Sequence, residues 1–272
     1  MKSLFSVKDK VIVITGGTGV LGSAIAKGLA QLGARIAVIG RSVERSDKLV
    51  DEIRKTGGTA IGVQADVLDK ELLFQARNEI LTRYGTVDVL INGAGGNLKG
   101  ATTGVDLSFF DLPEADINQV FQLNLMGTLL ASQVFGEVMI EKEQGVILNV
   151  SSMAAIQPLT NVVGYGAAKA AIINVTQWLA VHMNLHYSPD IRVNAIAPGV
   201  FLTKQNRFLL TDEEDGTLTE RGKTILAHTP MKRFGEPSDL VGTIAWLISD
   251  ASKFVTGIVV PVDGGFSAFS GV

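Results

Sequence analysis

A glycine-rich turn near the start of the sequence constrains the fold more than any other feature. The β-branched run at 11–14 enters the sequence TGGTGVLG at 15–22, and a helical pattern follows. Gly17, Gly19 and Gly22 match the spacing G-x-G-x-x-G between a strand and a helix. In that setting glycines let the backbone approach a pyrophosphate, which binds at the helix N-terminus where free N–H groups favour an anion. The turn predicts a dinucleotide site; a turn with a purely structural role is the alternative.

Strand-like and helix-like segments alternate along the rest of the chain. Apolar, β-branched runs predict strands at 35–39, 60–63, 87–91, 145–150, 191–196 and 258–262. Helical patterns occupy 23–32, 49–55, 72–84, 117–137, the run around Tyr165, and 237–249. This alternation predicts an α/β fold of the Rossmann type, a doubly wound parallel sheet with helices on both faces. No linker-like stretch or repeat interrupts it, so we expect a single domain over 1–272, with substrate loops at about 97–115 and 200–225.

The composition argues against several classes of partner. Hydrophobic residues make up 46% of the 272 residues, which is ample for a large core, and the formal net charge is −3 with acidic and basic residues interspersed. That balance disfavours nucleic acid or an anionic membrane as the main partner. Without Cys there is no disulfide or thiolate nucleophile. The charged N-terminus resembles no export signal, so we expect a cytoplasmic protein that binds a small molecule.

A tyrosine and a lysine lie four residues apart, at Tyr165 and Lys169, where an apolar run begins. On a helix this spacing puts both side chains on one face, one turn apart. An ammonium at roughly 4 Å stabilises a phenolate by roughly 4 kcal/mol at an effective dielectric constant of 20, which would lower the pKa of the tyrosine from about 10 to about 7. Such a tyrosine is a workable general acid or base. An ordinary helical tyrosine beside a solvated lysine is the alternative.

The ends of the second and third predicted strands indicate how a dinucleotide would be recognised. The second strand ends at Gly40-Arg41-Ser42, without the Asp or Glu that NAD sites use for the ribose. Arg41 can pair with a 2′-phosphate, so NADP is favoured over NAD; a loop charge with use of both cofactors is the alternative. Asp66 and Val67 follow the third strand, where a carboxylate can accept a hydrogen bond from the adenine amino group.

Together these features resemble the short-chain dehydrogenase/reductase family over essentially the whole chain. The matching features are, in order, the glycine turn, Asp66-Val67, Asn92-Gly-Ala-Gly95, Asn124, Ser152, Tyr165, Lys169, Pro198-Gly199 with Thr203, and Asp263-Gly-Gly265. The resemblance implies an NAD(P)-dependent oxidoreductase that interconverts a secondary alcohol and a ketone by hydride transfer. It implies cofactor contacts at Gly16, Thr18, Gly19, Leu21, Gly22, Arg41, Asp66, Val67, Asn92, Ala94, Gly95, Tyr165, Lys169, Pro198, Gly199, Val200 and Thr203.

The resemblance also assigns roles to four side chains. It implies that Ser152 holds and polarises the substrate oxygen and that Tyr165 exchanges a proton with it. Lys169 is implied to lower the pKa of Tyr165 and to grip the nicotinamide ribose, and Asn124 to support a water-linked proton relay. Family members are commonly tetramers that pair the helices starting near Ile117 and Tyr165. Both helical patterns are more apolar here than one buried face requires, so we expect a homotetramer.

Within the family, the chain looks like the bacterial D-mannonate oxidoreductases, also called D-fructuronate reductases. The similar segments are TGGTGVLGSA, NGAGGN followed by ATTG and FFDL, and the carboxyl-terminal SAFSGV. A sugar acid needs a cation for its carboxylate and hydrogen-bonding groups for its hydroxyls. Asn97, Lys99 and Arg207 border the predicted site and offer such groups. For each of them, a solvated surface position is the alternative.

Other functions stay open. Within enzymes, the substrate could be a 3-oxoacyl thioester on a carrier protein, or another keto sugar acid, as for a gluconate 5-dehydrogenase. In another class is a dinucleotide-sensing binding protein that lost its chemistry, although Ser152, Tyr165 and Lys169 are all present here. We expect no metal, because the three histidines, His182, His186 and His228, form no ligand pattern.

Overall fold

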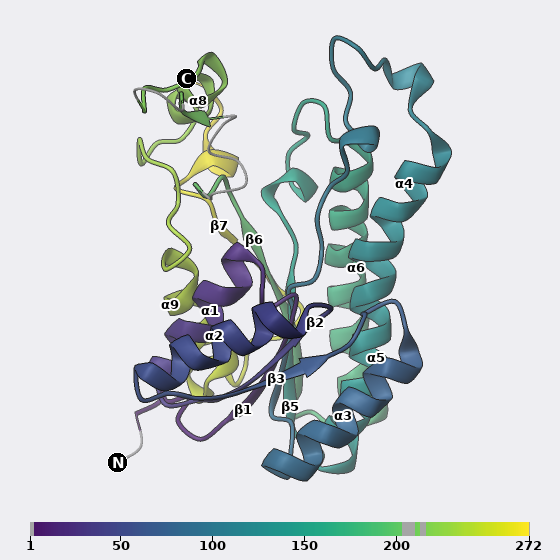
Figure 1. Cartoon of the computed structure of the whole chain (residues 1–272), viewed down its shortest axis with the longest axis vertical. Helices are drawn as coiled ribbons and strands as arrows, with labels where there is room; N and C mark the ends of the chain where they lie inside the picture. The colour runs from purple at the N-terminus through teal and green to yellow at the C-terminus, as the bar shows by residue number, and fades with distance from the viewer. Residues whose placement is uncertain (1–2, 203–209, 213–215, 272) are drawn as a thin grey trace.

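Seven parallel strands form one sheet at the centre of the protein (Figure 1). The computed structural model describes residues 3–202, 210–212 and 216–271. The strands lie in the order β3 (Thr59–Gln64), β2 (Arg35–Gly40), β1 (Val11–Thr15), β4 (Val89–Asn92), β5 (Gly145–Val150), β6 (Ile191–Pro198) and β7 (Val259–Val262). The predicted doubly wound sheet is confirmed. Its order reverses between β1 and β4, and open α/β sheets bind ligands at the carboxyl ends of strands beside such a reversal.

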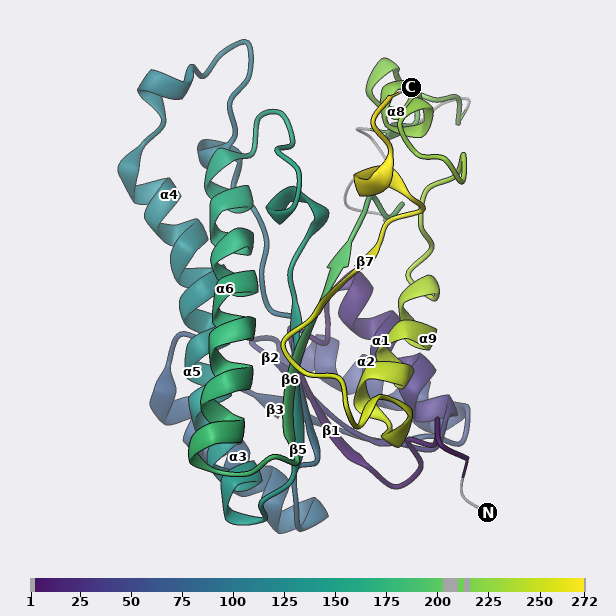
Figure 2. The ribbon, with the colours of Figure 1, turned by 180° about the vertical axis from the view of Figure 1, so that it is seen from behind.

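Helices cover both faces of the sheet (Figures 1 and 2). One layer holds α1 (Val20–Gln31), α2 (Val43–Lys55) and α9 (Asp239–Ile248), and the other holds α3 (Lys70–Tyr84), α5 (Gly127–Glu141) and α6 (Val163–His186). Successive strand residues face opposite layers. Ile12 and Ile14 belong to the core under the first layer. Val11 and Val13 belong to the core under the second, so the strand is apolar at every position.

Three helices differ from the sequence prediction. The first, α2, begins at Val43 rather than at 49, because the Ser42 hydroxyl caps it by accepting from the Arg45 N–H. The pattern at 117–137 corresponds to α4 (Glu114–Phe121) and α5, joined by a π-helical turn at Gln122–Met126. The apolar spacing continues through this turn, so the sequence does not reveal it. Between 200 and 237 no helix is predicted, whereas α8 (Glu220–Ala227) lies there, capped by the Thr219 hydroxyl accepting from the Gly222 N–H. Its few apolar residues give only a weak helical pattern.

The helical run Glu114–Glu141 is long and apolar enough, by length and composition, to cross a membrane. In this fold 56% of its apolar window is buried. Val134, Phe135 and Met139 on α5 are fully buried in the core beneath the second helix layer. Packing against the sheet therefore accounts for the apolar character of this run.

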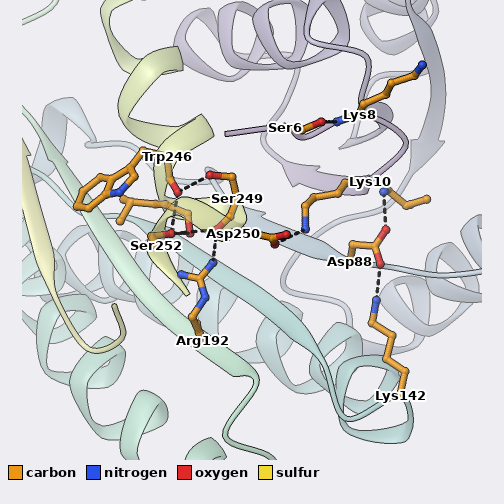
Figure 3. A network of polar contacts seen from close by, with 12 residues as sticks. Ser6, Lys8, Lys10, Asp88, Lys142, Arg192, Trp246, Ser249, Asp250 and Ser252 are labelled. Carbon is orange, nitrogen blue, oxygen red and sulfur yellow. Dashed lines mark hydrogen bonds and ion pairs between the residues drawn. The ribbon is translucent and has the colours of Figure 1, made fainter. Parts of the chain in front are cut away.

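Charged groups connect the amino ends of the strands, on the side of the sheet opposite the carboxyl ends (Figure 3). The Asp88 carboxylate accepts a hydrogen bond from the Val11 N–H at 2.8 Å and pairs with the Lys142 ammonium. Lys10 and Asp250 form a longer ion pair at 4.0 Å. The first contact links the start of β1 to the segment before β4, so it helps to set how these strands meet.

Arg192 on β6 holds the end of α9 against the sheet (Figure 3). The side chain is 7% exposed, and its guanidinium donates to the Ser249 carbonyl at 3.1 Å and to the Val255 carbonyl at 3.2 Å. Ser249 follows the last residue of α9, where a cation also complements the helix dipole. The buried cation therefore joins β6 to two carbonyl groups, which also accept from Asn194 Nδ2 and from the Ser252 hydroxyl.

Replacing this cation should destabilise the fold. Arg192→Leu removes two hydrogen bonds from a charged donor to the Ser249 and Val255 carbonyls, so we expect the free energy of unfolding to fall by about 3 kcal/mol. Equilibrium urea unfolding, followed by tryptophan fluorescence, measures this. The matched control is Arg83→Leu, whose ion pair with Glu79 is exposed and should contribute less than about 1 kcal/mol. Equal losses in the two variants would contradict the assignment.

Candidate active site

The glycine turn after β1 packs its backbone against the segment that follows β4. Gly16 has φ +65°, and a Cβ atom there would lie 2.7 Å from the Ala94 Cα. A Cβ atom at Gly22 would lie 2.5 Å from the Gly16 carbonyl oxygen, so neither position accepts a side chain. Leu21 packs against the core. The N-cap of α1 is Gly19, and no described side chain caps this helix, which leaves its first N–H groups for a ligand.

The segment after β4 joins the glycine turn to the predicted proton-transfer residues. The Ala94 N–H donates to the Thr15 hydroxyl oxygen at 3.3 Å. A Cβ atom at Gly95 would lie 2.6 Å from Asn124 Oδ1 and 3.0 Å from Lys169 Nζ. The backbone at Gly95 therefore touches both side chains, and the two parts of the predicted site form one continuous surface.

Asn124 lies in the π-helical turn between α4 and α5 and is fully buried. Its Oδ1 accepts a hydrogen bond from the Gly96 N–H at 3.1 Å. Its Nδ2 donates to the Gly96 carbonyl at 2.7 Å and to the Val120 carbonyl at 2.8 Å. The side-chain amide thus fixes the backbone at Gly96. A π turn is a common device for directing one helix residue into a site.

Ser152, Tyr165 and Lys169 meet at the carboxyl end of β5. The Ser152 hydroxyl oxygen accepts from the Ala154 N–H at 3.1 Å, and Ser152 forms a side-chain hydrogen bond with Tyr165. Lys169 is 4% exposed; its Nζ donates to the Val150 carbonyl at 2.8 Å and lies 5.6 Å from the centre of the Tyr165 ring. Both side chains belong to α6, as their spacing predicts.

Burial controls the pKa of both side chains on α6. It raises the pKa of Tyr165, which the hydrogen bond with Ser152 opposes only in part. It lowers the pKa of Lys169 to about 8. The predicted lowering of the pKa of Tyr165 is therefore wrong for this structure. The phenolate loses its hydration on burial, and the ammonium donates to the Val150 carbonyl rather than to the phenol oxygen.

The residues predicted to contact the adenosine half lie at the ends of β2 and β3. Arg41 is exposed just after β2. Thr18 of the glycine turn lies beside the same strand end, 3.2 Å from where a Cβ atom of Gly40 would be. Asp66 follows β3 and accepts a backbone N–H bond, and Val67 is buried. The structure thus gathers these residues at the carboxyl ends of two adjacent strands.

Pro198, Gly199 and Val200 lie at the carboxyl end of β6, on the same edge of the sheet. The Gly199 N–H donates to the Val262 carbonyl at 3.0 Å. A Cβ atom at Gly199 would lie 2.7 Å from the Asp263 Cα, so the end of β6 packs closely against the turn after β7. The predicted cofactor contact Thr203 and the predicted substrate contact Arg207 lie outside the described residues.

Two predicted substrate residues lie in the loop after β4, part of which packs beside Tyr165. Leu98 and Tyr165 contact the same small apolar cluster. Asn97 and Lys99, on either side of Leu98, are exposed, and Asn97 donates to a hydroxyl within its own loop. Over the part of the chain that the structure describes, no three His, Cys, Asp or Glu side chains form a group that could hold a metal ion.

Two further residues support the site without being predicted. Ser151 donates from its hydroxyl to the Lys169 carbonyl at 2.9 Å, which attaches α6 to the end of β5. Its position beside Ser152 is the only sequence signal for this contact. Gln157 donates from Nε2 to the Ser267 carbonyl at 2.7 Å and so links the loop after Ser152 to the carboxyl-terminal segment. These two residues are 110 positions apart, and no local pattern joins them.

The arrangement fits a dinucleotide. Close backbone packing at Gly16 and Gly22 leaves a bare turn at an uncapped helix N-terminus, which suits a pyrophosphate. The turn packs against the segment that contains Gly95. Gly95 in turn lies against the buried Lys169 ammonium, which is next to a tyrosine hydrogen-bonded to a serine. A cation and two hydroxyl groups at the end of a cofactor turn can position an oxygen atom and exchange a proton with it.

Known proteins are similar to this chain in sequence and fold. The short chain dehydrogenase family model matches residues 10–214. An oxidoreductase of Bacillus subtilis (strain 168), named UxuB and described as uncharacterized, is 52% identical over 97% of this chain and 96% of its own. A crystal structure from Haemophilus influenza with bound NAD, provisionally named a D-mannonate oxidoreductase, is 47% identical and has a TM-score of 0.91 over 98% of each chain.

A third relative has a more specific name. The 5-keto-D-gluconate 5-reductase of Escherichia coli (strain K12) is 32% identical over 97% of this chain and 98% of its own. All three matches extend over nearly the whole of both chains, and the family model covers the glycine turn and the Ser152–Lys169 region alike. The chain belongs to the short-chain dehydrogenase family and is an NAD(P)-dependent oxidoreductase.

Proposed function

We propose that the protein interconverts a secondary alcohol and a ketone on a sugar acid, of the D-mannonate and D-fructuronate type. One observation carries this proposal: the backbone at Gly95 joins the dinucleotide turn to Asn124 and Lys169, beside the Ser152–Tyr165 pair. The nicotinamide ring supplies the hydride chemistry when the dinucleotide is bound. The side chains of the protein hold the substrate oxygen and move its proton.

In the reduction direction, Tyr165 gives its proton to the ketone oxygen. Its raised pKa keeps the phenol protonated at neutral pH. The Ser152 oxygen already accepts from the Ala154 N–H, so its own O–H is oriented for donation, and it stabilises the charge that develops on the substrate oxygen. Lys169 carries a positive charge below a pH of about 8 and stabilises the phenolate that forms.

The names of the relatives support a sugar acid as substrate. Two of them are called a D-mannonate oxidoreductase and a 5-keto-D-gluconate 5-reductase. Lys99 is an exposed cation beside the apolar cluster that contacts Tyr165, and it can pair with a carboxylate; Asn97 can bond a hydroxyl. 5-Ketogluconate and 3-oxoacyl thioesters are the alternative substrates. A binding protein without chemistry is disfavoured, because Ser152 and Tyr165 remain hydrogen-bonded.

We also propose that NADP is the preferred dinucleotide, that Arg41 binds its 2′-phosphate, and that no metal takes part. No acidic residue occupies Gly40-Arg41-Ser42, and Arg41 is exposed at the end of β2. The relative from Haemophilus influenza holds NAD, so the preference needs a direct test.

The protein is proposed to work as a cytoplasmic homotetramer in which α6 faces a second copy. From 170 to 186 the sequence has no Asp, Glu, Lys or Arg. Trp178, Val181 and Leu185 on this stretch are 60%, 59% and 75% exposed. An apolar helix face of this kind is typical of an interface between subunits. A monomer mass from light scattering at micromolar concentration would contradict this assembly.

A substrate panel tests the proposed function. Hexuronates, ketogluconates and 3-oxoacyl thioesters are assayed with NADH and NADPH, following absorbance at 340 nm. D-Fructuronate should give the highest kcat/KM. Tyr165→Phe should lower kcat on it by roughly 100-fold or more, because the proton donor is lost. The affinity for the dinucleotide, measured by fluorescence titration, should stay nearly unchanged.

Tyr187→Phe is the matched control, because Tyr187 follows the last turn of α6 and is 48% exposed. It should leave turnover and cofactor affinity unchanged. Near-normal turnover in Tyr165→Phe would rule out its role as proton donor. A thioester that outperforms every sugar acid would rule out the proposed substrate class.

The pH dependence of ketone reduction should report the charge on Lys169. As the pH rises through about 8, Lys169 loses its proton and no longer stabilises the phenolate, so kcat/KM should fall between pH 7 and pH 9. Lys169→Arg keeps a positive charge over this range. In that variant the decline near pH 8 should disappear, whatever its absolute rate. A decline of the same midpoint in both proteins would mean that another group causes it.

Removing the cation after β2 should change the choice of dinucleotide. A hydrogen bond to a charged group contributes about 1.5–3 kcal/mol, so Arg41→Ala should raise KM for NADPH by about 10- to 100-fold. KM for NADH should change by less than about twofold, because NADH lacks the 2′-phosphate. Arg83→Ala, on the distant α3, is the control and should affect neither. Equal changes for both dinucleotides would contradict the proposed contact.

A further inference from the structure

A row of buried polar side chains crosses the protein from α5 to α6 beneath the site. It consists of Ser132 on α5, Asn92 at the end of β4, Asn149 on β5 and Thr176 on α6, and none is more than 5% exposed. The proton transfer described above uses none of these side chains. Buried polar groups in an apolar core lower stability unless they are paired, so this row calls for a physical account.

The row is continuous. Asn92 Nδ2 donates to the Ser132 hydroxyl at 2.9 Å and to Asn149 Oδ1 at 2.8 Å. Asn149 Nδ2 donates to the Thr176 hydroxyl at 2.9 Å. Asn92 and Asn149 are direct neighbours in the register of β4 and β5, so their side chains leave the sheet on the same face. From there they reach the two helices.

Each end of the row is attached to a helix backbone that leads to site residues. On α5, Ser132 donates to the Thr128 carbonyl at 2.7 Å, and Thr128 donates to the Asn124 carbonyl at 2.8 Å. On α6, Thr176 donates to the Ile172 carbonyl at 2.7 Å. The row therefore runs from Asn124 itself to the helix that bears Tyr165 and Lys169.

Stability alone does not explain this arrangement. Asn92 Oδ1 is buried and has no partner among the described residues, and an unpaired buried atom of this kind destabilises the fold. Apolar side chains of the same shape would avoid that cost. Directional hydrogen bonds, however, fix the register of two helices on a sheet, whereas apolar contacts alone tolerate sliding.

We propose that the row Ser132–Asn92–Asn149–Thr176 positions the active site by holding α5 and α6 in register on β4 and β5. Ser152 follows Asn149 by three residues on the β5 segment, and Tyr165 and Lys169 lie on α6, where Lys169 bonds the Val150 carbonyl next to Asn149. The register of α6 on β5 therefore sets both the Ser152–Tyr165 contact and the burial of Lys169. This inference rests on the proposed function.

Thr176→Val is the first test, because it removes the hydroxyl and keeps the shape of the side chain. When α6 is less firmly held on β5, the proton donor is misaligned, so kcat should fall by about tenfold while KM changes less than about twofold. Lys169 should become better hydrated. The midpoint of its titration should therefore move upward from about 8, and the decline in kcat/KM should move with it.

The Lys169 titration is measured by NMR on protein labelled at lysine Cε, assigned with Lys169→Arg. It needs neither substrate nor dinucleotide. If no compound in the substrate panel is turned over, the proposed function is wrong. The titration of Lys169 still tests the proposed role of the row in that case. Thr176→Ser restores the hydroxyl and should restore both kcat and the titration midpoint.

Ser252→Ala is the matched control for the loss of a buried hydroxyl. Ser252 is 1% exposed and donates to carbonyls near the end of α9, in the network of Figure 3 at the opposite edge of the sheet. It should lower the unfolding midpoint without changing kcat or the Lys169 titration. If Thr176→Val does not fold, Ser132→Ala tests the other end of the row and should lower kcat in the same way.

A double variant tests whether the row acts as one unit. Ser132→Ala combined with Thr176→Val should lower kcat by less than the product of the two single effects, because either change alone interrupts the row. The inference is overturned if folded Thr176→Val keeps kcat within twofold of the wild type and an unshifted Lys169 titration. It is also overturned if Ser252→Ala changes both quantities to the same extent.

Discussion

The burial of the Lys169 ammonium is the interaction on which the rest of the site depends. Moving a cation out of water costs several kcal/mol unless it is paired, and here Lys169 donates to the Val150 carbonyl and lies beside the Tyr165 ring. The cost appears as a pKa lowered to about 8. An ammonium with a pKa of about 8 is charged at neutral pH, where it can stabilise a phenolate, and it loses its proton when the pH rises above 8. The surrounding fold must therefore keep this amine in place against its tendency to become hydrated.

Three features of the fold meet this demand. The Ser151 hydroxyl donates to the Lys169 carbonyl and attaches α6 to the end of β5, next to the Val150 carbonyl that the amine contacts. Gly95 allows the backbone after β4 to lie directly against the amine, because any side chain there would overlap it. The π turn places Asn124 against Gly95 as well, next to the amine, and fixes that backbone through Gly96. The candidate active site is thus built from contacts between the backbone and a few buried polar groups.

The amino edge of the sheet, where the strands begin, and the carboxyl edge, where they end, have different roles. At the amino edge, Arg192 and Asp88 pair with backbone groups and join helices and strands, so the charges there stabilise the fold (Figure 3). At the carboxyl edge lie the uncapped glycine turn, the exposed Arg41 and Tyr165, which are proposed to bind ligands. The row Ser132–Asn92–Asn149–Thr176 lies close to the carboxyl edge of the sheet. It is proposed to connect the apolar core to the candidate active site at that edge. Parallel strands make this division possible, since all of their carboxyl ends meet on one side.

Much of this could be predicted from short stretches of sequence. The β-branched runs, the glycine turn and the i,i+4 spacing of Tyr165 and Lys169 each depend on neighbours along the chain, so the sequence by itself determined the parallel α/β sheet, the dinucleotide turn and the helix that bears the two side chains. The π turn at Asn124, the raised pKa of Tyr165 and the pairing of Asn92 with Asn149 came only from the tertiary structure. Their physical reason is shared: burial, strand register and backbone contact join residues that are far apart in sequence, and no local pattern records which of them will meet.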